Sequence, residues 1–288
     1  MSSKKQRRNL LEMSYEDVQA HVKKTDVIMV AMGSCEKHGS HDPLGTDSFT
    51  TLVMVQRAAE KADVLYTPLM PFGYSPHHMG TVGEGVGTIT LSGETYRRLV
   101  YEIARSLIFH GYNKIVFVSH HGSNSKPIDE ILRRIRYETG AFVAWYKTPT
   151  EREATVVEDL LQGPPEETPG WHAGELETST VMAYDPDLVI RERMKQDRTH
   201  APKWMGPAFS KKDGTAQVMF QRSENITVPM EHHEYSDTAT IGNPFRSSRE
   251  QGLALVERIS DHLAAFLEEV KKFDIKVTQR DYPERAHY

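Results

Sequence analysis

The chain has 288 residues, of which 38% are hydrophobic, and a formal net charge of -5 at pH 7. This length and composition support a hydrophobic core, and the acidic balance gives no electrostatic reason to expect nucleic acid or a membrane as partner. No apolar run approaches the roughly 20 residues that span a bilayer. The single cysteine, Cys35, excludes an internal disulfide framework, and the basic N-terminus lacks the apolar core of a signal peptide. We therefore expect a cytoplasmic protein.

The first half of the chain alternates between predicted helices and strands. The expected helices cover residues 14–24, 48–62, 94–109 and 126–139. The expected strands cover residues 26–32, 64–68, 88–91, 114–119 and 141–146. A loop rich in Gly and Pro, 71–87, interrupts the alternation. The pattern predicts an α/β fold with a mostly parallel sheet covered by helices on both faces.

The second half is less regular. Helices are expected at 175–184 and 247–272, and the stretch 195–245 has many turn formers and no long periodic segment. No internal repeat or low-complexity linker divides the chain. The sequence thus predicts one domain over residues 14–272, preceded by a flexible basic tail, 1–13, and followed by a C-terminal tail, 273–288.

Three polar clusters occur at predicted strand or helix ends. Their sequences are GSCEKHGSHDPLGTD from residue 33, SHHGSN from residue 119 and WHAGELETS from residue 171. One such cluster alone is most often a solvated loop, but in a parallel sheet ligands bind beyond the carboxyl ends of the strands. Imidazole and carboxylate groups together are what a divalent metal site requires, and a shared carboxylate can bridge two ions. The clusters therefore predict a metal site.

The three motifs resemble those of the creatininase family of metal-dependent amidohydrolases. The family patterns are approximately G-S-x-E-Q-H-G-x-H-L-P-L-G-T-D, N-G-H-G-G-N and H-A-G-x-x-E-T-S, and the segment YSDTATIGNP before the last helix is also similar. The resemblance covers residues from about 26 to 270. It implies a three-layer α/β/α sandwich, often assembled into homo-oligomers, with a hexamer favoured.

The resemblance also implies a set of site residues. Glu36, His38, Asp47 and His121 would bind two divalent ions (Zn, Mn or Fe), with Asp47 bridging. Ser123 stands where creatininase itself has a metal-binding Glu, so a carboxylate from the third motif would replace it. We favour Glu177 as this fifth ligand, with Glu175 as the rival.

The resemblance also implies that His172 matches the family's proton-transfer histidine, and we expect its pKa to be about 6 to 7, near the unperturbed value.

Substrate contacts are expected from His78 and Glu84, in the long loop, and from Trp171, which would wall the site. His120 would point away from His121 in an extended segment, so we interpret it as structural. The pair His232 and His233 lies in an irregular stretch and receives no role.

These features predict a hydrolase that uses water activated by a metal pair to open a small cyclic substrate at an amide C–N bond. An alternative reaction with the same site residues is cleavage of a C–C bond in a cyclic diketone derived from an inositol. The absence of the creatininase Glu at Ser123 and the His-rich loop favour this alternative. A third hypothesis is a non-catalytic metal-binding or sugar-binding protein, against which His172 argues.

Overall fold

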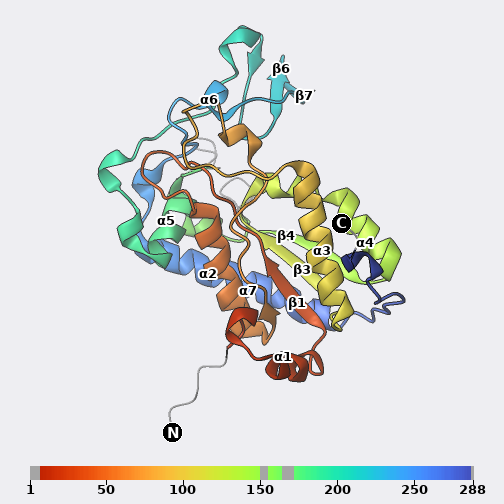
Figure 1. Ribbon diagram of the computed structural model, residues 1–288. Helices are drawn as coiled ribbons and strands as arrows, with labels where there is room; N and C mark the ends of the chain where they lie inside the picture. The colour runs from red at the N-terminus through yellow and green to blue at the C-terminus, as the bar shows by residue number, and fades with distance from the viewer. Residues whose placement is uncertain (1–6, 150–154, 164–171, 287–288) are drawn as a thin grey trace.

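The centre of the molecule is a four-stranded parallel sheet with the strand order β2-β1-β3-β4. The computed structural model describes residues 7–149, 155–163 and 172–286 (Figure 1). The strands are β1 (Val27–Ala31), β2 (Leu65–Tyr66), β3 (Lys114–Ser119) and β4 (Phe142–Lys147). Strands β1 and β3 pair from Val27 with Lys114 to Ala31 with Val118. Both are fully buried, which explains why each appears in the sequence as a continuous apolar run.

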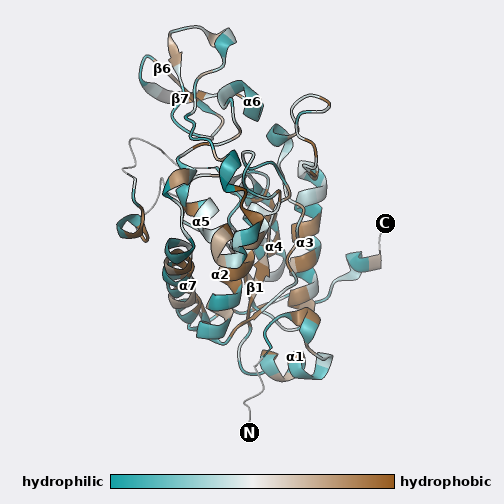
Figure 2. Ribbon diagram, turned by 90° about the vertical axis from the view of Figure 1, so that its left-hand side faces the viewer, coloured by the Kyte–Doolittle hydropathy of each residue, from teal (hydrophilic) through white to brown (hydrophobic). Residues whose placement is uncertain are grey.

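Two helix layers cover the sheet, so the fold is the expected three-layer α/β/α sandwich. Helices α2 (Thr46–Ala62) and α7 (Arg249–Lys271) pack on one face, and α3 (Gly93–Phe109) and α4 (Asp129–Thr139) on the other. Successive strand residues face opposite layers. In β1, Met29 therefore packs toward α2 and α7, and Ile28 toward α3 and α4. Figure 2 shows the hydrophobic residues concentrated around β1 between these layers.

The remaining elements surround this sandwich. Helix α1 (Tyr15–Val22) lies at the bottom in Figure 1, and α5 (Glu175–Tyr184) packs against α2 and α7. At the opposite end lie α6 (His232–Tyr235) and a three-stranded antiparallel sheet. Its strands are β5 (Phe209–Ser210), β6 (Gln217–Phe220) and β7 (Ser223–Thr227). Among the described residues, no helix is both long and apolar enough to cross a bilayer.

Two predicted elements differ from the structure. The expected strand at 88–91 is absent, because Ile89 pairs with Cys35 and Thr90 with Gly73, and these two isolated bridges do not extend into a ladder. The helix expected from residue 126 begins at Asp129, since Gly122–Ser125 forms a 3-10 turn and Pro127 follows it. Lys126 keeps helical backbone angles, but Pro127 has no N–H to donate to a preceding carbonyl group, so the 3-10 turn does not continue as one helix into Asp129.

Parts of both predicted tails pack on the sandwich. Leu10, in the 3-10 turn Leu10–Glu12, packs against the α3 side of the core. At the other end, Tyr282 is buried in the same core, and the Arg105 guanidinium donates to the Asp281 carbonyl oxygen. The C-terminal segment therefore contributes to the stability of the α3 layer.

We predict that Tyr282→Ala lowers the free energy of unfolding by about 3 kcal/mol, because it removes a side chain that is only 6% exposed and leaves a cavity. Urea unfolding followed by circular dichroism measures the change. Tyr137, which is 75% exposed, provides the control, and Tyr137→Ala should shift the free energy by less than about 0.5 kcal/mol. Equal unfolding midpoints for the two variants would show that the C-terminal segment does not contribute to the stability of the fold.

Candidate metal centre

Five side chains from four segments meet at the carboxyl ends of the central strands. Glu36 and His38 come from the loop after β1, and His121 follows β3. Asp47 and Glu177 lie in the first turns of α2 and α5. All five are buried. The loop after β1 approaches α2 so closely that a Cβ on Gly33 would lie 2.2 Å from Ser48 Oγ, so glycine is required there.

The ligand atoms form two overlapping groups. In each group the candidate atoms lie within 4.8 Å of one another, and the groups are Glu36, Asp47 and His121, and His38, Asp47 and Glu177. Asp47 belongs to both. Its Oδ2 lies 3.3 Å from His121 Nδ1 and 3.6 Å from His38 Nε2. His38 Nε2 is also 3.6 Å from Glu177 Oε2. The two donor groups, each of which could hold a cation, therefore share the Asp47 carboxylate.

Hydrogen bonds orient the rings so that a lone pair faces this cluster. His38 Nδ1 lies 3.1 Å from the Glu36 carbonyl oxygen, to which it donates, so Nε2 carries the lone pair. His121 Nε2 lies 3.0 Å from the Tyr74 carbonyl oxygen, which leaves Nδ1 as the acceptor facing Asp47. Ser34 Oγ donates to Asp47 Oδ2 over 2.6 Å. Such outer contacts fix ligand orientation in metal sites.

The Glu177 carboxylate is held by two donors. His120 Nε2 lies 2.9 Å from Oε1, and the Ala173 backbone N–H donates to Oε2 over 2.6 Å. Ala173 has φ = 53°, a left-handed conformation that is uncommon for a residue with a side chain and directs its N–H inward. His120 Nδ1 is bonded to Thr148 Oγ1 over 2.5 Å. His120 was interpreted as structural, but α5 brings Glu177 to it, which the sequence pattern does not reveal.

Glu175 is engaged elsewhere. Its carboxylate accepts hydrogen bonds from the backbone N–H groups of Gln162 and Gly163, over 2.5 Å and 3.3 Å, and from the Gln251 amide. These contacts tie the start of α5 to the segment before it and to α7. The structure therefore brings Glu177, and not its rival Glu175, to the cluster.

The charges of the cluster fit divalent cations. Among the described residues, no Lys or Arg forms an ion pair with Glu36, Asp47 or Glu177, although burying unpaired carboxylates is costly. Burial raises the pKa of Glu36 to about 7. Burial also opposes ionisation of Asp47, but the positive charges that His38 and His121 carry when protonated outweigh it and hold the pKa of Asp47 well below its ordinary value.

Two atoms of the cluster, Glu36 Oε2 and His38 Nε2, are buried with no hydrogen-bond partner among the described residues. Carboxylate oxygens and imidazole nitrogens are ligands that Zn, Mn and Fe accept. The donor set therefore fits a pair of divalent metal ions.

His172 lies at the edge of the cluster. Its Nε2 donates to the Lys37 carbonyl oxygen over 2.7 Å, which leaves Nδ1 as the acceptor, 4.0 Å from Glu36 Oε1. The ring stacks on His38 at a centroid distance of 4.0 Å. The expected pKa of about 6 to 7 is wrong, because burial, with the neighbouring His38 and His232, lowers the pKa of His172 well below the ordinary value.

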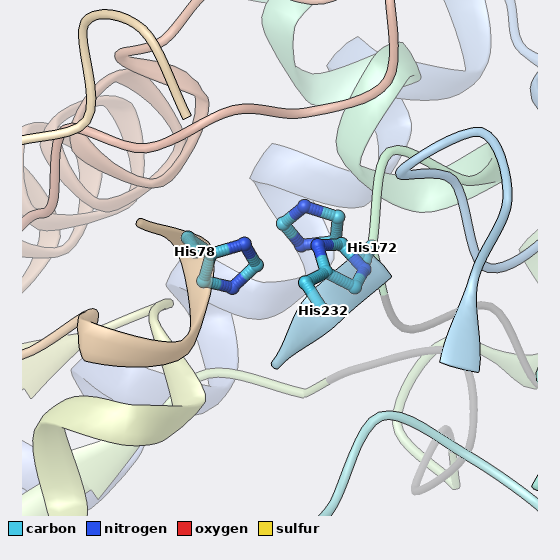
Figure 3. A group of neighbouring side chains, drawn as sticks. All are labelled: His78, His172 and His232. Atoms are coloured by element: carbon cyan, nitrogen blue, oxygen red, sulfur yellow. The ribbon is translucent and has the colours of Figure 1, made fainter. Parts of the chain in front are cut away.

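Two further histidines complete a trio with His172 (Figure 3). His78 ends the 3-10 turn Pro76–His78, and its Nε2 lies 3.2 Å from Glu36 Oε1. His232 comes from α6. Sequence reasoning gave His232 no role, because α6 has only four residues and no periodicity to mark which side chains face inward. The adjacent pair His232 and His233 was the feature of the sequence that could have indicated a functional role there.

Two predicted substrate contacts lie outside this arrangement. Glu84 is in an exposed loop, where its Oε2 lies 3.2 Å from His233 Nδ1 and accepts from the Thr81 backbone N–H. Trp171 lies outside the described residues.

A family model and several known proteins are similar to this chain. The family model "Creatininase: Creatinine amidohydrolase" matches residues 11–267. A creatinine amidohydrolase from Pseudomonas putida is 32% identical over 195 residues, which are 64% of this chain and 74% of that protein. A 3-dehydro-scyllo-inosose hydrolase from Thermotoga maritima is 26% identical over 62% of this chain, a match that spans 57% of that protein.

Solved structures show the same fold over nearly the whole chain. A crystal structure of creatinine amidohydrolase (creatininase) is 27% identical and has a TM-score of 0.70, with 93% of this chain and 100% of that chain covered. A structure described as "Creatininase Mn" is also 27% identical, with a TM-score of 0.68 and the same coverage. The resemblance found in the three sequence motifs is thereby confirmed. The chain belongs to the creatininase family of metal-dependent hydrolases.

Proposed function

We propose that this protein binds two divalent metal ions and hydrolyses an amide C–N bond in a small cyclic substrate. The observation that carries the proposal is the pair of donor groups that share Asp47 and lie beside His172. The Pseudomonas putida relative, named creatinine amidohydrolase, supports the choice of an amide bond. Screening the metal-loaded protein against lactams, formamides and cyclic diketones tests it, and turnover confined to non-amide substrates would contradict it.

Each residue of the site has a distinct task in this proposal. Glu36, Asp47 and His121 would hold one ion, and His38, Asp47 and Glu177 the other. A metal pair supplies Lewis acidity and lowers the pKa of water at neutral pH. His172 handles the proton: its Nε2–H is fixed on the Lys37 carbonyl oxygen, so Nδ1 is free to accept a proton from water and deliver it to the leaving nitrogen.

A second candidate reaction uses the same residues to cleave a C–C bond in a cyclic diketone derived from an inositol. Two observations favour it. Ser123 stands where creatininase itself has a metal-binding Glu, and the Thermotoga maritima relative is named 3-dehydro-scyllo-inosose hydrolase. The same substrate screen distinguishes the reactions, because a diketone yields a carboxylate without release of an amine.

The metal content of the purified protein tests the proposed pair of ions. We expect two divalent ions per wild-type chain, and metal analysis will also identify them as Zn, Mn or Fe. Asp47→Ala should lose both ions, because Asp47 belongs to both donor groups, whereas Glu177→Ala should lose one. Glu84→Ala provides the control, since that carboxylate is exposed and away from the cluster. An Asp47→Ala protein that retains both ions would contradict the shared-carboxylate arrangement.

The proposed role of His172 can be tested by substitution. His172→Ala should keep both ions and the fold but lose about 10²–10⁴-fold in kcat, the usual contribution of general acid–base catalysis. Steady-state kinetics with metal analysis on the same sample makes the measurement. The exposed His110 supplies a matched control, and His110→Ala should retain wild-type kcat. A metal-replete His172→Ala protein with full activity would remove His172 from the mechanism.

His120 is predicted to act by positioning Glu177. His120→Leu removes the N–H that bonds Glu177 Oε1 and should weaken binding of one ion by about 10–100-fold. His120→Gln retains an amide N–H at a similar reach and should restore much of that affinity. Competition with a chelator measures both. If His120→Leu and His120→Gln have equal metal affinity, the His120 N–H does not position Glu177, and the side chain contributes only packing.

Assembly into a homo-oligomer, with a hexamer favoured, is also part of the proposal. The loop that carries Met79, Val82, Val86 and Ile89 exposes these apolar side chains, which is typical of an interface. We expect the segment 147–171 to contribute as well, although part of it lies outside the described residues. Light scattering at micromolar concentration should give a multiple of the 32.8 kDa chain mass, and a monomer mass would contradict this.

A further inference from the structure

Asp42 is a buried carboxylate that belongs to neither donor group of the candidate metal centre. Its side chain is fully buried, and it forms no ion pair with a Lys or Arg in the described part of the chain. The approximate family pattern has Leu at this position, so the carboxylate is a departure of this chain from that pattern. Burying a carboxylate costs free energy unless hydrogen bonds replace those to water. The hydrogen bonds of Asp42 therefore indicate what this side chain does.

The side chain of Asp42 is bonded to α5. Thr178 Oγ1 donates to Asp42 Oδ2 over 2.7 Å. Thr178 directly follows Glu177 at the start of α5. The backbone N–H of Asp42 donates to the His38 carbonyl oxygen over 3.3 Å. Asp42 thus links the segment of one candidate ligand, His38, to the helix that carries another, Glu177.

His41 forms a second link between the same two segments. Its Nε2 lies 3.2 Å from the Ala173 carbonyl oxygen, to which it donates, and 3.3 Å from Thr178 Oγ1. Ala173 is the residue with a left-handed backbone whose N–H donates to Glu177 Oε2. Such a conformation persists only where neighbouring groups fix it. Ala173 is therefore held by His41 through its carbonyl oxygen and by Glu177 through its N–H.

Two further polar side chains at the start of α5 bond to α7 instead. Glu175 and Ser179 both contact Gln251. Gly174, the N-cap residue, offers no side chain to cap the helix. A carboxylate oxygen must lie about 2.0–2.2 Å from a zinc ion, so a small displacement of the first turn would carry its ligand out of range. The bond to Asp42 fixes this turn against the loop after β1.

We propose that Asp42 is a positioning residue for Glu177, which acts through Thr178 to keep the Glu177 carboxylate at the ion that His38 and Asp47 also bind. The inference rests on the proposed function for the presence of that ion. Because Glu177 belongs to only one of the two donor groups, the link acts on one ion of the pair.

The experiment compares Asp42→Leu, which removes the acceptor, with Asp42→Asn, which keeps an oxygen that can accept from the Thr178 hydroxyl. Competition with a chelator measures the affinity for each ion. Asp42→Leu should weaken binding of one ion about 10–100-fold and leave the other unchanged, whereas Asp42→Asn should retain most of the affinity. Thr178→Val removes the donor and should give the same loss as Asp42→Leu. The double variant should lose no more than either single variant, since both changes break one hydrogen bond.

Ser179→Ala is the matched control, because Ser179 is the next residue of α5 and its hydroxyl bonds to Gln251 of α7. It should lower the urea midpoint of unfolding without changing the affinity for either ion. Hydrogen–deuterium exchange of the metal-free protein adds a readout that needs no ion. The backbone amides of residues 173–178 should exchange faster in Asp42→Leu than in the wild type, and Asp42→Asn should resemble the wild type.

Three results of the competition would overturn the inference. These are wild-type affinity for both ions in a folded Asp42→Leu protein, equal losses in the Leu and Asn variants, and additive losses in the double variant. Failure of the proposed function is separate, since it would appear as a wild-type protein without the metal pair or without hydrolysis. In a protein without the metal pair, the exchange measurement decides, and equal exchange of residues 173–178 in the wild type and Asp42→Leu would overturn the inference.

Discussion

The burial of three carboxylates without a Lys or Arg partner among the described residues is the constraint on which the site depends. Asp47 is central because both candidate cation sites include it. Its place in the first turn of α2 puts it near the positive end of the helix dipole, and Ser34 Oγ donates to it. The N-terminus of α2 must therefore lie close to the loop after β1, which explains why Gly33 tolerates no side chain.

The sandwich provides rigid supports for the groups that contact Asp47. Parallel strands end at the same edge of a sheet, so the loops after β1 and β3 present their histidines to the same point. Each ring is then fixed by a backbone carbonyl, that of Glu36 for His38 and that of Tyr74 for His121. Most of the orientation of the site thus comes from main-chain groups, which are held by the packing of the sheet and its helices.

The sequence predicts the parts of this arrangement that have local signals. Continuous apolar runs revealed β1 and β3, and the motifs after them contained Glu36, His38, Asp47 and His121. Contacts between distant segments have no such signal. His120 was interpreted as structural, and only the fold shows that Glu177 contacts it. The strand expected at 88–91 failed because strand formation needs a partner along its whole length, and Ile89 and Thr90 pair with different segments.

The site has two chemically different halves, and His172 belongs to both. One half contains the buried carboxylates and their imidazole partners, while the other contains His78 and His232, whose rings include nitrogen atoms without a hydrogen-bond partner in the described part of the chain. His172 stacks on His38 of the first half and faces His78 and His232 of the second. Because Lys37 fixes the His172 ring through Nε2, the free Nδ1 remains at the boundary between the halves. In the proposed reaction, a proton carrier at that boundary would lie beside the Glu36 carboxylate, which is the location that hydrolysis of a bound carbonyl compound requires.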